Sequence, residues 1–256
     1  MGTLHKVFVL LSGGVDSSTT LAIARDEFPN AEFETVTIDY GQRHKREAEC
    51  AYVQAANFGA THHIIDAKGF MEGMLVDKGA DNEQIPEVSY ADLPAGISPT
   101  YVTFRNGLML SILAARAQAW VMEQEKLAEK IPTGGYNSKT GEPYYEVPQI
   151  EATIYLGVHA DDGVNWAYPD CTPEFVGPMS AAIFTGTYNK VRVRAPLLYL
   201  TKPAVVKAGS ELGVNYAETW SCYKGDEVHC GVCPTCRSRK EAFELNGLQD
   251  PTVYAA

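Results

Sequence analysis

The stretch KVFVLLSGGVDSS, residues 6–18, decides the fold. Its first half is a short apolar run that predicts a buried strand, and the two glycines after it predict a turn. Residues 16–28 then carry a helical pattern. A strand, a glycine-rich turn and a helix in this order are typical of the first unit of an α/β domain.

Strands and helices continue to alternate along the chain. We expect four more strands, at residues 33–39, 62–66, 153–158 and 190–195. The expected helices cover residues 42–57, 106–129, 173–186 and 202–212. Because strands that alternate with helices of this length form right-handed crossovers, the sequence predicts an α/β, Rossmann-like fold. Its core is a mostly parallel five-stranded sheet with helices on both faces.

Two stretches interrupt the alternation. Residues 67–100 are rich in glycine, proline and acidic residues and predict a loop or lid. Residues 131–148 contain three prolines, three glycines and three tyrosines, which favour an inserted surface hairpin or disordered loop. We therefore expect a main domain at residues 1–200 that contains both stretches, followed by a small C-terminal helical region at residues 201–256.

The charge of the chain limits its partners. Lys and Arg number 21 and Asp and Glu number 32, so the formal net charge is −11. Broad neutralisation of nucleic-acid phosphates needs a surplus of basic residues, so a nucleic-acid partner is not expected. The chain has no run of eighteen apolar residues and no signal-like start, and we expect a cytoplasmic protein without a membrane partner.

The glycine pair also predicts an anion site. Glycines let backbone N–H groups point inward, and the start of the next helix adds the positive end of its dipole. Ser12, Ser17 and Ser18 offer hydroxyl donors, whereas the lysine of the GxxxxGK[ST] phosphate loop is missing. The alternative is an ordinary helix start with Ser12 or Asp16 as its cap.

Four of the six cysteines crowd together near the C-terminus. They are Cys222, Cys230, Cys233 and Cys236. Four thiolates at these spacings predict a closed tetrahedral zinc site, structural because no coordination position is left for water. An iron–sulfur cluster has the same ligand count and is the main alternative. Cys50 and Cys171 stand apart from this group.

The placement of SGGVDS directly after an apolar strand resembles the PP-loop of the N-type ATP pyrophosphatases, a family with the adenine nucleotide alpha hydrolase-like fold. The resemblance implies that ATP is cleaved between its α and β phosphates, with Asp16 near a Mg²⁺ ion. It also implies an ATP site made of Leu11, Ser12, Gly13, Gly14, Val15, Asp16, Ser17, Ser18, Thr19, Thr20, Leu21 and Ile38.

The phosphate loop and the C-terminal C-x7-C-G-x-C-x2-C pattern together resemble the 7-cyano-7-deazaguanine synthase family of the queuosine pathway. The supporting strings include DYGQRH at residues 39–44, YPDC at 168–171 and TWSCY at 219–223. The resemblance implies that 7-carboxy-7-deazaguanine, ammonia and ATP give the nitrile through an adenylate and an amide. It further implies a homodimer, Mg²⁺ bound with ATP and one structural Zn²⁺ per chain.

The same resemblance implies roles for single residues. Asp16, Lys202 and Arg105 are expected to be catalytic. The residues expected to contact the deazaguanine are Tyr40, Gln42, Arg43, Tyr168, Asp170 and Glu174. Asp170 suits the N1–H and amino donors of a guanine-like base, although a helix cap is its alternative role. Tyr168 could equally line the core, and the two arginines could form surface ion pairs.

Some positions differ from the usual family pattern. They are Thr103, Phe104, His159 and Thr172, and they concern the acceptor pocket. A relative that stops at the amide, or that transfers the activated acyl group to another amine, is therefore the alternative function. A tRNA thiolase or lysidine-type ligase fits poorly with the charge of −11. A nucleotide-binding regulator without chemistry fits poorly with Asp16, Arg105 and Lys202.

Overall fold

The computed structural model describes residues 3–41, 45–71, 85–88, 96, 98, 101–128, 132–141, 143–145, 148–224 and 227–255. Most of the predicted lid at 67–100 lies outside these residues. At its beginning the structure has a short helix, α3 (Lys68–Met71), where a loop was expected.

Five parallel strands form the central sheet, in the order β3-β2-β1-β6-β7. They are β1 (Leu4–Leu10), β2 (Glu32–Asp39), β3 (Thr61–Asp66), β6 (Ile150–Tyr155) and β7 (Val191–Arg194). The predicted parallel α/β sheet is confirmed. The strand expected at 153–158 instead ends at Tyr155, where its pairing with Val9 of β1 and Arg194 of β7 ends. Residues 156–158 therefore extend beyond the edge of the sheet.

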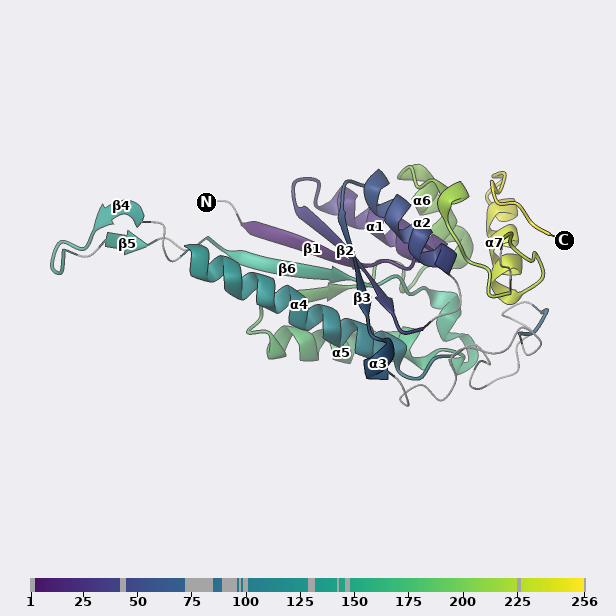
Figure 1. The fold of residues 1–256 in the computed structure, drawn as a ribbon, viewed down its shortest axis with the longest axis horizontal. Helices are drawn as coiled ribbons and strands as arrows, with labels where there is room; N and C mark the ends of the chain where they lie inside the picture. Colours follow the sequence, from purple (N-terminus) through teal and green to yellow (C-terminus); the bar gives the residue numbers. More distant parts are fainter. Residues whose placement is uncertain are drawn as a thin grey trace.

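Helices cover both faces of the sheet, as Figure 1 shows. α1 (Val15–Glu27) and α2 (Lys45–Asn57) lie on one face, and α4 (Arg105–Ala128) and α5 (Pro173–Gly186) lie on the other. The strand β1 contributes side chains to the cores on both faces of the sheet, because successive side chains of a strand point to opposite faces. Val7 and Val9 pack under α1 and α2, while Phe8 and Leu10 pack against α4.

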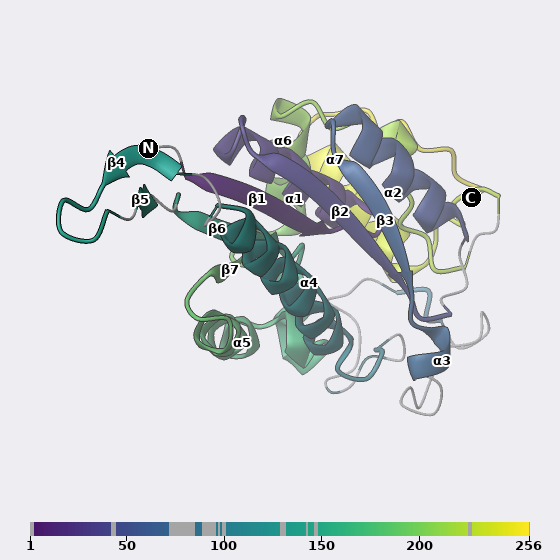
Figure 2. The same ribbon diagram turned by 60° about the vertical axis from the view of Figure 1, so that its left-hand side comes forward.

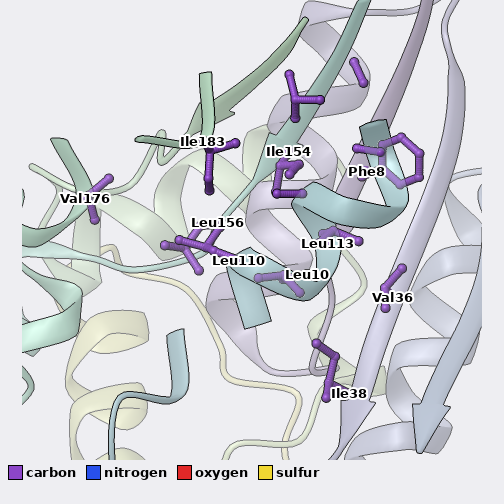
Figure 3. Close-up of a cluster of buried hydrophobic side chains, with 14 of the residues drawn as sticks. Phe8, Leu10, Val36, Ile38, Leu110, Leu113, Ile154, Leu156, Val176 and Ile183 are labelled. Carbon is purple, nitrogen blue, oxygen red and sulfur yellow. The ribbon is translucent and has the colours of Figure 1, made fainter. Parts of the chain in front are cut away.

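The larger core lies between the sheet and the pair α4 and α5 (Figure 3). Leu110 and Leu113 of α4 are fully buried there against Ile154 of β6. Val176 and Ile183 of α5 complete the layer on the side of β7. The long helix α4 is therefore fixed by its apolar side, which sets the position of its first residue, Arg105, at the carboxyl end of the sheet.

The excursion at 131–148 contains a two-stranded antiparallel hairpin. Its strands are β4 (Pro132–Tyr136) and β5 (Pro143–Tyr145). The hairpin extends away from the rest of the molecule, at the end where the strands of the main sheet begin (Figures 1 and 2). Tyr136 and Tyr144 are exposed on it. Of the two predicted forms, the structure has the hairpin.

The C-terminal helices α6 (Lys202–Glu211) and α7 (Pro234–Leu245) form a further layer outside α1. Val205 and Val206 of α6 pack with Val15 of α1 and Phe243 of α7. The fully buried Arg239 of α7 also holds this layer, through the hydroxyl of Thr219 and the carboxylate of Asp250.

Three short 3₁₀ turns complete the described secondary structure. They are η2 (Ala160–Trp166), η3 (Pro169–Cys171) and η4 (Tyr216–Glu218). Among the residues that the structure describes, none of the helices combines the length and the apolar character that a membrane crossing would need.

Candidate active site and metal centre

A cavity opens where the strand order reverses. β2 lies on one side of β1 and β6 on the other, and ligands of open α/β sheets bind outside the carboxyl ends of strands at such a point. The cavity is lined by Leu10 at the end of β1 and Leu11 after it, by Ile38 of β2 and by residues 156–159 after β6. Because β6 ends at Tyr155, residues 156–159 lie beyond the sheet and form one wall of the cavity.

The segment between β1 and α1 forms a tight loop around one hydroxyl. Ser17 Oγ accepts a hydrogen bond from the Ser12 amide at 3.1 Å and lies 3.0 Å from Ser12 Oγ. Ser12 Oγ in turn accepts from the Gly14 amide at 3.3 Å. Gly14 caps α1 and has no side chain to bond the first helical amides. No side chain caps the helix start, so neither Ser12 nor Asp16 has the alternative role of a helix cap. An anion site at this helix start would need uncapped amides.

Gly13 lets this loop lie directly against α2. Its φ is +84°, and a Cβ added there would lie 2.3 Å from the Glu47 carbonyl oxygen and 2.6 Å from the Ala51 amide. The Gly13 carbonyl accepts a hydrogen bond from the Trp220 amide at 2.9 Å. The loop is thus held between α2 and the C-terminal segment, and no residue with a side chain fits at position 13.

A small charge cluster lies at the start of α1. Lys202 Nζ lies 2.6 and 2.7 Å from the two carboxylate oxygens of Asp16. Burial opposes ionisation of Asp16, but the charges of Lys202 and His159 and the Lys202 hydrogen bond together outweigh it and hold the pKa of that carboxyl below its ordinary value. His159 Nε2 lies 3.4 Å from Asp162 Oδ1, and burial raises the pKa of Asp162. Asp161 bonds the first amide of α6.

Apart from Gly13, which packs against α2, the residues expected at the ATP site fall into two groups. Those that line the cavity are Leu11, Ser12, Gly14, Val15, Asp16, Ser17 and Ile38. Ser18, Thr19, Thr20 and Leu21 are buried in the packing of α1 instead. The Thr19 hydroxyl lies 2.8 Å from the Tyr216 hydroxyl, for example. These four residues fix the helix that carries the loop, and they do not line the cavity.

The expected catalytic and substrate residues are only partly brought together. Asp16, Lys202, Arg105, Tyr40 and Tyr168 all line the cavity. Arg105 donates a hydrogen bond to the Tyr40 hydroxyl at 3.3 Å. Glu174 is exposed on the first turn of α5 and does not line this cavity. Gln42 and Arg43 lie outside the described residues.

Asp170 takes a structural position behind the cavity wall. It is 4% exposed, and its Oδ2 accepts a hydrogen bond of 2.9 Å from the Asn106 amide in the first turn of α4. The Asn106 side chain returns a bond to the Asp170 carbonyl at 3.2 Å. Asp170 therefore caps α4 from a distant part of the chain, and not α5, the helix that follows it in sequence.

Several cavity residues were not predicted as site residues. Glu47, Asp162 and Thr235 line the cavity together with the predicted residues, as does Tyr223 of the TWSCY string. Glu47 follows the DYGQRH string and Asp162 lies seven residues after the end of β6, so proximity to a predicted motif or strand was the only available indication. Their positions depend on how α2 and the segment after β6 pack.

The four clustered cysteines converge on one point. Their Sγ atoms all lie within 4.8 Å of one another, and those of Cys230 and Cys236 are 4.0 Å apart. Four sulfurs bound to one zinc ion at the usual distance lie about 3.8 Å apart. The Cys230 amide also donates to Cys222 Sγ, and the Cys233 amide to Cys230 Sγ, both at 3.3 Å. Such bonds stabilise thiolates. The cluster therefore fits a single metal ion.

The metal centre adjoins the cavity. Thr235 Oγ1 lies 3.4 Å from Cys233 Sγ and donates a bond of 2.6 Å to the Ser221 carbonyl. Ser221 and Thr235 both line the cavity, and the neighbouring Trp220 amide holds the Gly13 carbonyl. A metal bound by the cysteines would thus fix the segment that supports the phosphate loop.

The fold and the site define a Rossmann-like α/β protein with a glycine-rich loop at its strand-order switch point and a four-cysteine cluster beside it. The family model described as Queuosine biosynthesis protein QueC matches residues 6–134 and 143–247. The chain belongs to this family. The match leaves out residues 135–142, and of these the described residues 135–141 comprise the end of β4 and the turn that follows it.

Relatives of similar length support the assignment to this family. A 7-cyano-7-deazaguanine synthase of Porphyromonas gingivalis is 35% identical over 96% of this chain and 96% of its own. The protein of that name from Thermoplasma acidophilum is also 35% identical, over 97% of this chain and 92% of its own. The 7-cyano-7-deazaguanine synthase 1 of Colwellia psychrerythraea is 32% identical over 98% and 99%.

Proposed function

We propose that this chain uses ATP and ammonia to convert 7-carboxy-7-deazaguanine to 7-cyano-7-deazaguanine. The observation that carries the proposal is the full-length likeness to relatives named for that product. The phosphate loop and the Asp16–Lys202 pair at one cavity supply what such a reaction needs. The enzyme is then an AMP-forming C–N ligase.

The chemical logic is that of a leaving group. A carboxylate does not lose oxide to ammonia at neutral pH, but an acyl-adenylate loses AMP readily. In the first stage ammonia gives the amide, and in the second stage a new ATP activates the amide oxygen so that AMP leaves and the nitrile remains. Both stages need the same loop and the same placement of one substrate oxygen beside the α-phosphate.

ATP is bound in this proposal by the loop amides and by the start of α1. Lys202 neutralises the pyrophosphate as it forms, because its Nζ already lies in the cavity beside the loop. Asp16 is a carboxylate of the kind Mg²⁺ prefers, and part of it faces the cavity. When Mg²⁺ is bound with ATP, it neutralises phosphate charge.

The deazaguanine is bound on the other side of the same cavity. Tyr40 and Tyr168 offer aromatic faces and Arg105 a guanidinium for a carboxylate or phosphate. Gln42, Arg43, Asp170 and Glu174 remain candidate contacts to the substrate. The Asp170 carboxylate is engaged by the Asn106 amide, so its contact with the base would use Oδ1.

The metal of the four-cysteine centre is, in this proposal, one structural Zn²⁺ per chain. A [4Fe–4S] cluster binds each thiolate to a different iron, which spaces the sulfurs more widely than a single ion does. The separation of 4.0 Å between Cys230 and Cys236 favours one ion. The thiolates must stay reduced, which supports a cytoplasmic location. We also propose a homodimer, by analogy with the family.

The test is product analysis with the purified protein, ATP, Mg²⁺, ammonium and 7-carboxy-7-deazaguanine. The proposal expects AMP and a product lighter than the amide by one water. An amide that accumulates as the final product would support the alternative that the reaction stops there. AMP formation without amide or nitrile would exclude the proposed function.

A further inference from the structure

One carboxyl group in the cavity has no role in the proposed function so far. Three acidic side chains line the cavity, those of Asp16, Glu47 and Asp162. Asp16 is paired with Lys202, and Asp162 bonds the His159 amide at 3.1 Å. Within the part of the chain that the structure describes, the Glu47 carboxylate has neither a hydrogen bond nor an ion pair.

The backbone around Glu47 fixes this carboxylate close to the phosphate loop. Glu47 lies in the first turn of α2, and its carbonyl packs on Gly13. The side chain lines the same cavity as Arg105 and Tyr40. A carboxylate held by a helix beside the loop can approach an acyl-adenylate formed there without moving the ATP contacts.

The surroundings of Glu47 also suit a proton acceptor. Burial raises the pKa of Glu47 from 4.5 to about 7, and the charge of Arg105 on α4 only partly opposes this. Arg105 in turn faces Tyr40 and Tyr223, and Cys50 is the nearby thiol on α2. The raised pKa of the Glu47 carboxyl lies closer to the pKa of ammonium, so proton transfer from ammonium to the carboxylate is less unfavourable.

We propose that Glu47 binds the ammonium ion in the cavity and takes its proton, so that neutral ammonia attacks the acyl-adenylate. The idea rests on the proposed function. Ammonium gives one proton to the Glu47 carboxylate. The nitrogen lone pair then forms the C–N bond, and the C–O bond to AMP breaks with its electron pair staying on the phosphate oxygen. The nitrogen loses its second proton to water as the amide forms.

The test compares two partial reactions in Glu47→Gln. Adenylation is measured as ATP–pyrophosphate exchange that depends on 7-carboxy-7-deazaguanine, in the absence of ammonium. Amide formation is then measured with ammonium at increasing pH. We expect near-normal exchange, and an amide rate lower by about 10²-fold, the usual contribution of a general base. In the parent protein kcat should rise through a pH near the pKa of about 7 and then level off, whereas in the variant the rate should show no plateau there and should keep rising with the fraction of free ammonia.

Hydroxylamine supplies a second measurement. It is neutral at pH 7 and needs no base before it attacks, so hydroxamate formation by Glu47→Gln should stay within a few-fold of the parent rate. The matched control is Glu49→Gln, because Glu49 is exposed on the same helix and should behave like the parent protein.

An unchanged ammonium rate in Glu47→Gln, or an equal loss with ammonium and hydroxylamine, would overturn the role of Glu47. Loss of exchange would also overturn it, because Glu47 would then serve adenylation or folding. Absence of exchange in the parent protein would instead refute the proposed function itself.

Discussion

Gly13→Ala tests the dependence of the phosphate loop on its contact with α2. A Cβ at this position would lie 2.3 Å from the Glu47 carbonyl oxygen, which belongs to the helix backbone and cannot turn aside. The left-handed φ of +84° costs an alanine about 1–2 kcal/mol. An overpacked contact costs about 1–3 kcal/mol more. We therefore expect a loss of about 2–5 kcal/mol, against a total stability of about 5–15 kcal/mol.

Substitutions at two other glycines measure the backbone strain separately from the steric overlap. Gly213 has a φ of +79° and Gly177 lies inside α5, and a Cβ would meet nothing within 4 Å at either position. Gly213→Ala should lose about 1 kcal/mol from backbone strain alone. Gly177→Ala should be neutral or more stable by about 0.5–1 kcal/mol.

Urea denaturation with and without MgATP is the assay for all three variants. The parent, Gly213→Ala and Gly177→Ala should be stabilised by MgATP, whereas Gly13→Ala should lose this effect because the loop is displaced. If Gly13→Ala matched Gly213→Ala in stability and were still stabilised by MgATP, the argument for a loop held between α2 and the C-terminal segment would be refuted.

Three further predictions concern the four-cysteine cluster, Lys202 and Glu47. Cys233→Ala should lose bound zinc and much of its folding stability, as metal analysis and thermal denaturation would show, while Cys50→Ala should keep near one zinc per chain. Lys202→Met should lower kcat/KM for AMP formation by about 10²–10³-fold, with steady-state kinetics as the check. The Glu47 pKa of about 7 lies above the unfolded value of 4.5, so its contribution to stability is full below pH 4.5 and is lost as the pH rises through 7. Glu47→Gln should therefore gain up to about 3 kcal/mol relative to the parent between pH 5 and pH 8 in urea titrations.

The parts of the fold that depend on local pattern were predictable. The strand and helix around SGGVDS, and the helix at 173–186, lie where their residues indicate. The end of β6 was placed three residues too late, because Leu156 and Val158 are apolar like the strand before them. Only the pairing with β1 and β7 shows where the strand stops.

The residues that line the cavity were predictable where they belong to a recognisable motif, and not elsewhere. Asp16 and Lys202 are 186 positions apart, and the expectation that both serve one site came from the resemblance to a family. Glu47 enters the cavity only because Gly13 lets the loop pack on α2. The bond between Asp170 and the Asn106 amide joins two distant segments, so sequence alone could suggest a cap but not the helix that is capped.

The central claim is that two successive adenylations take place in one cavity. The most direct measurement is the stoichiometry of AMP to product when 7-carboxy-7-deazaguanine reacts with ¹⁵N-ammonium and excess ATP. The account predicts two AMP for each nitrile and the label in the nitrile nitrogen. One AMP per molecule with labelled amide as the final product, or AMP without labelled product, would contradict it.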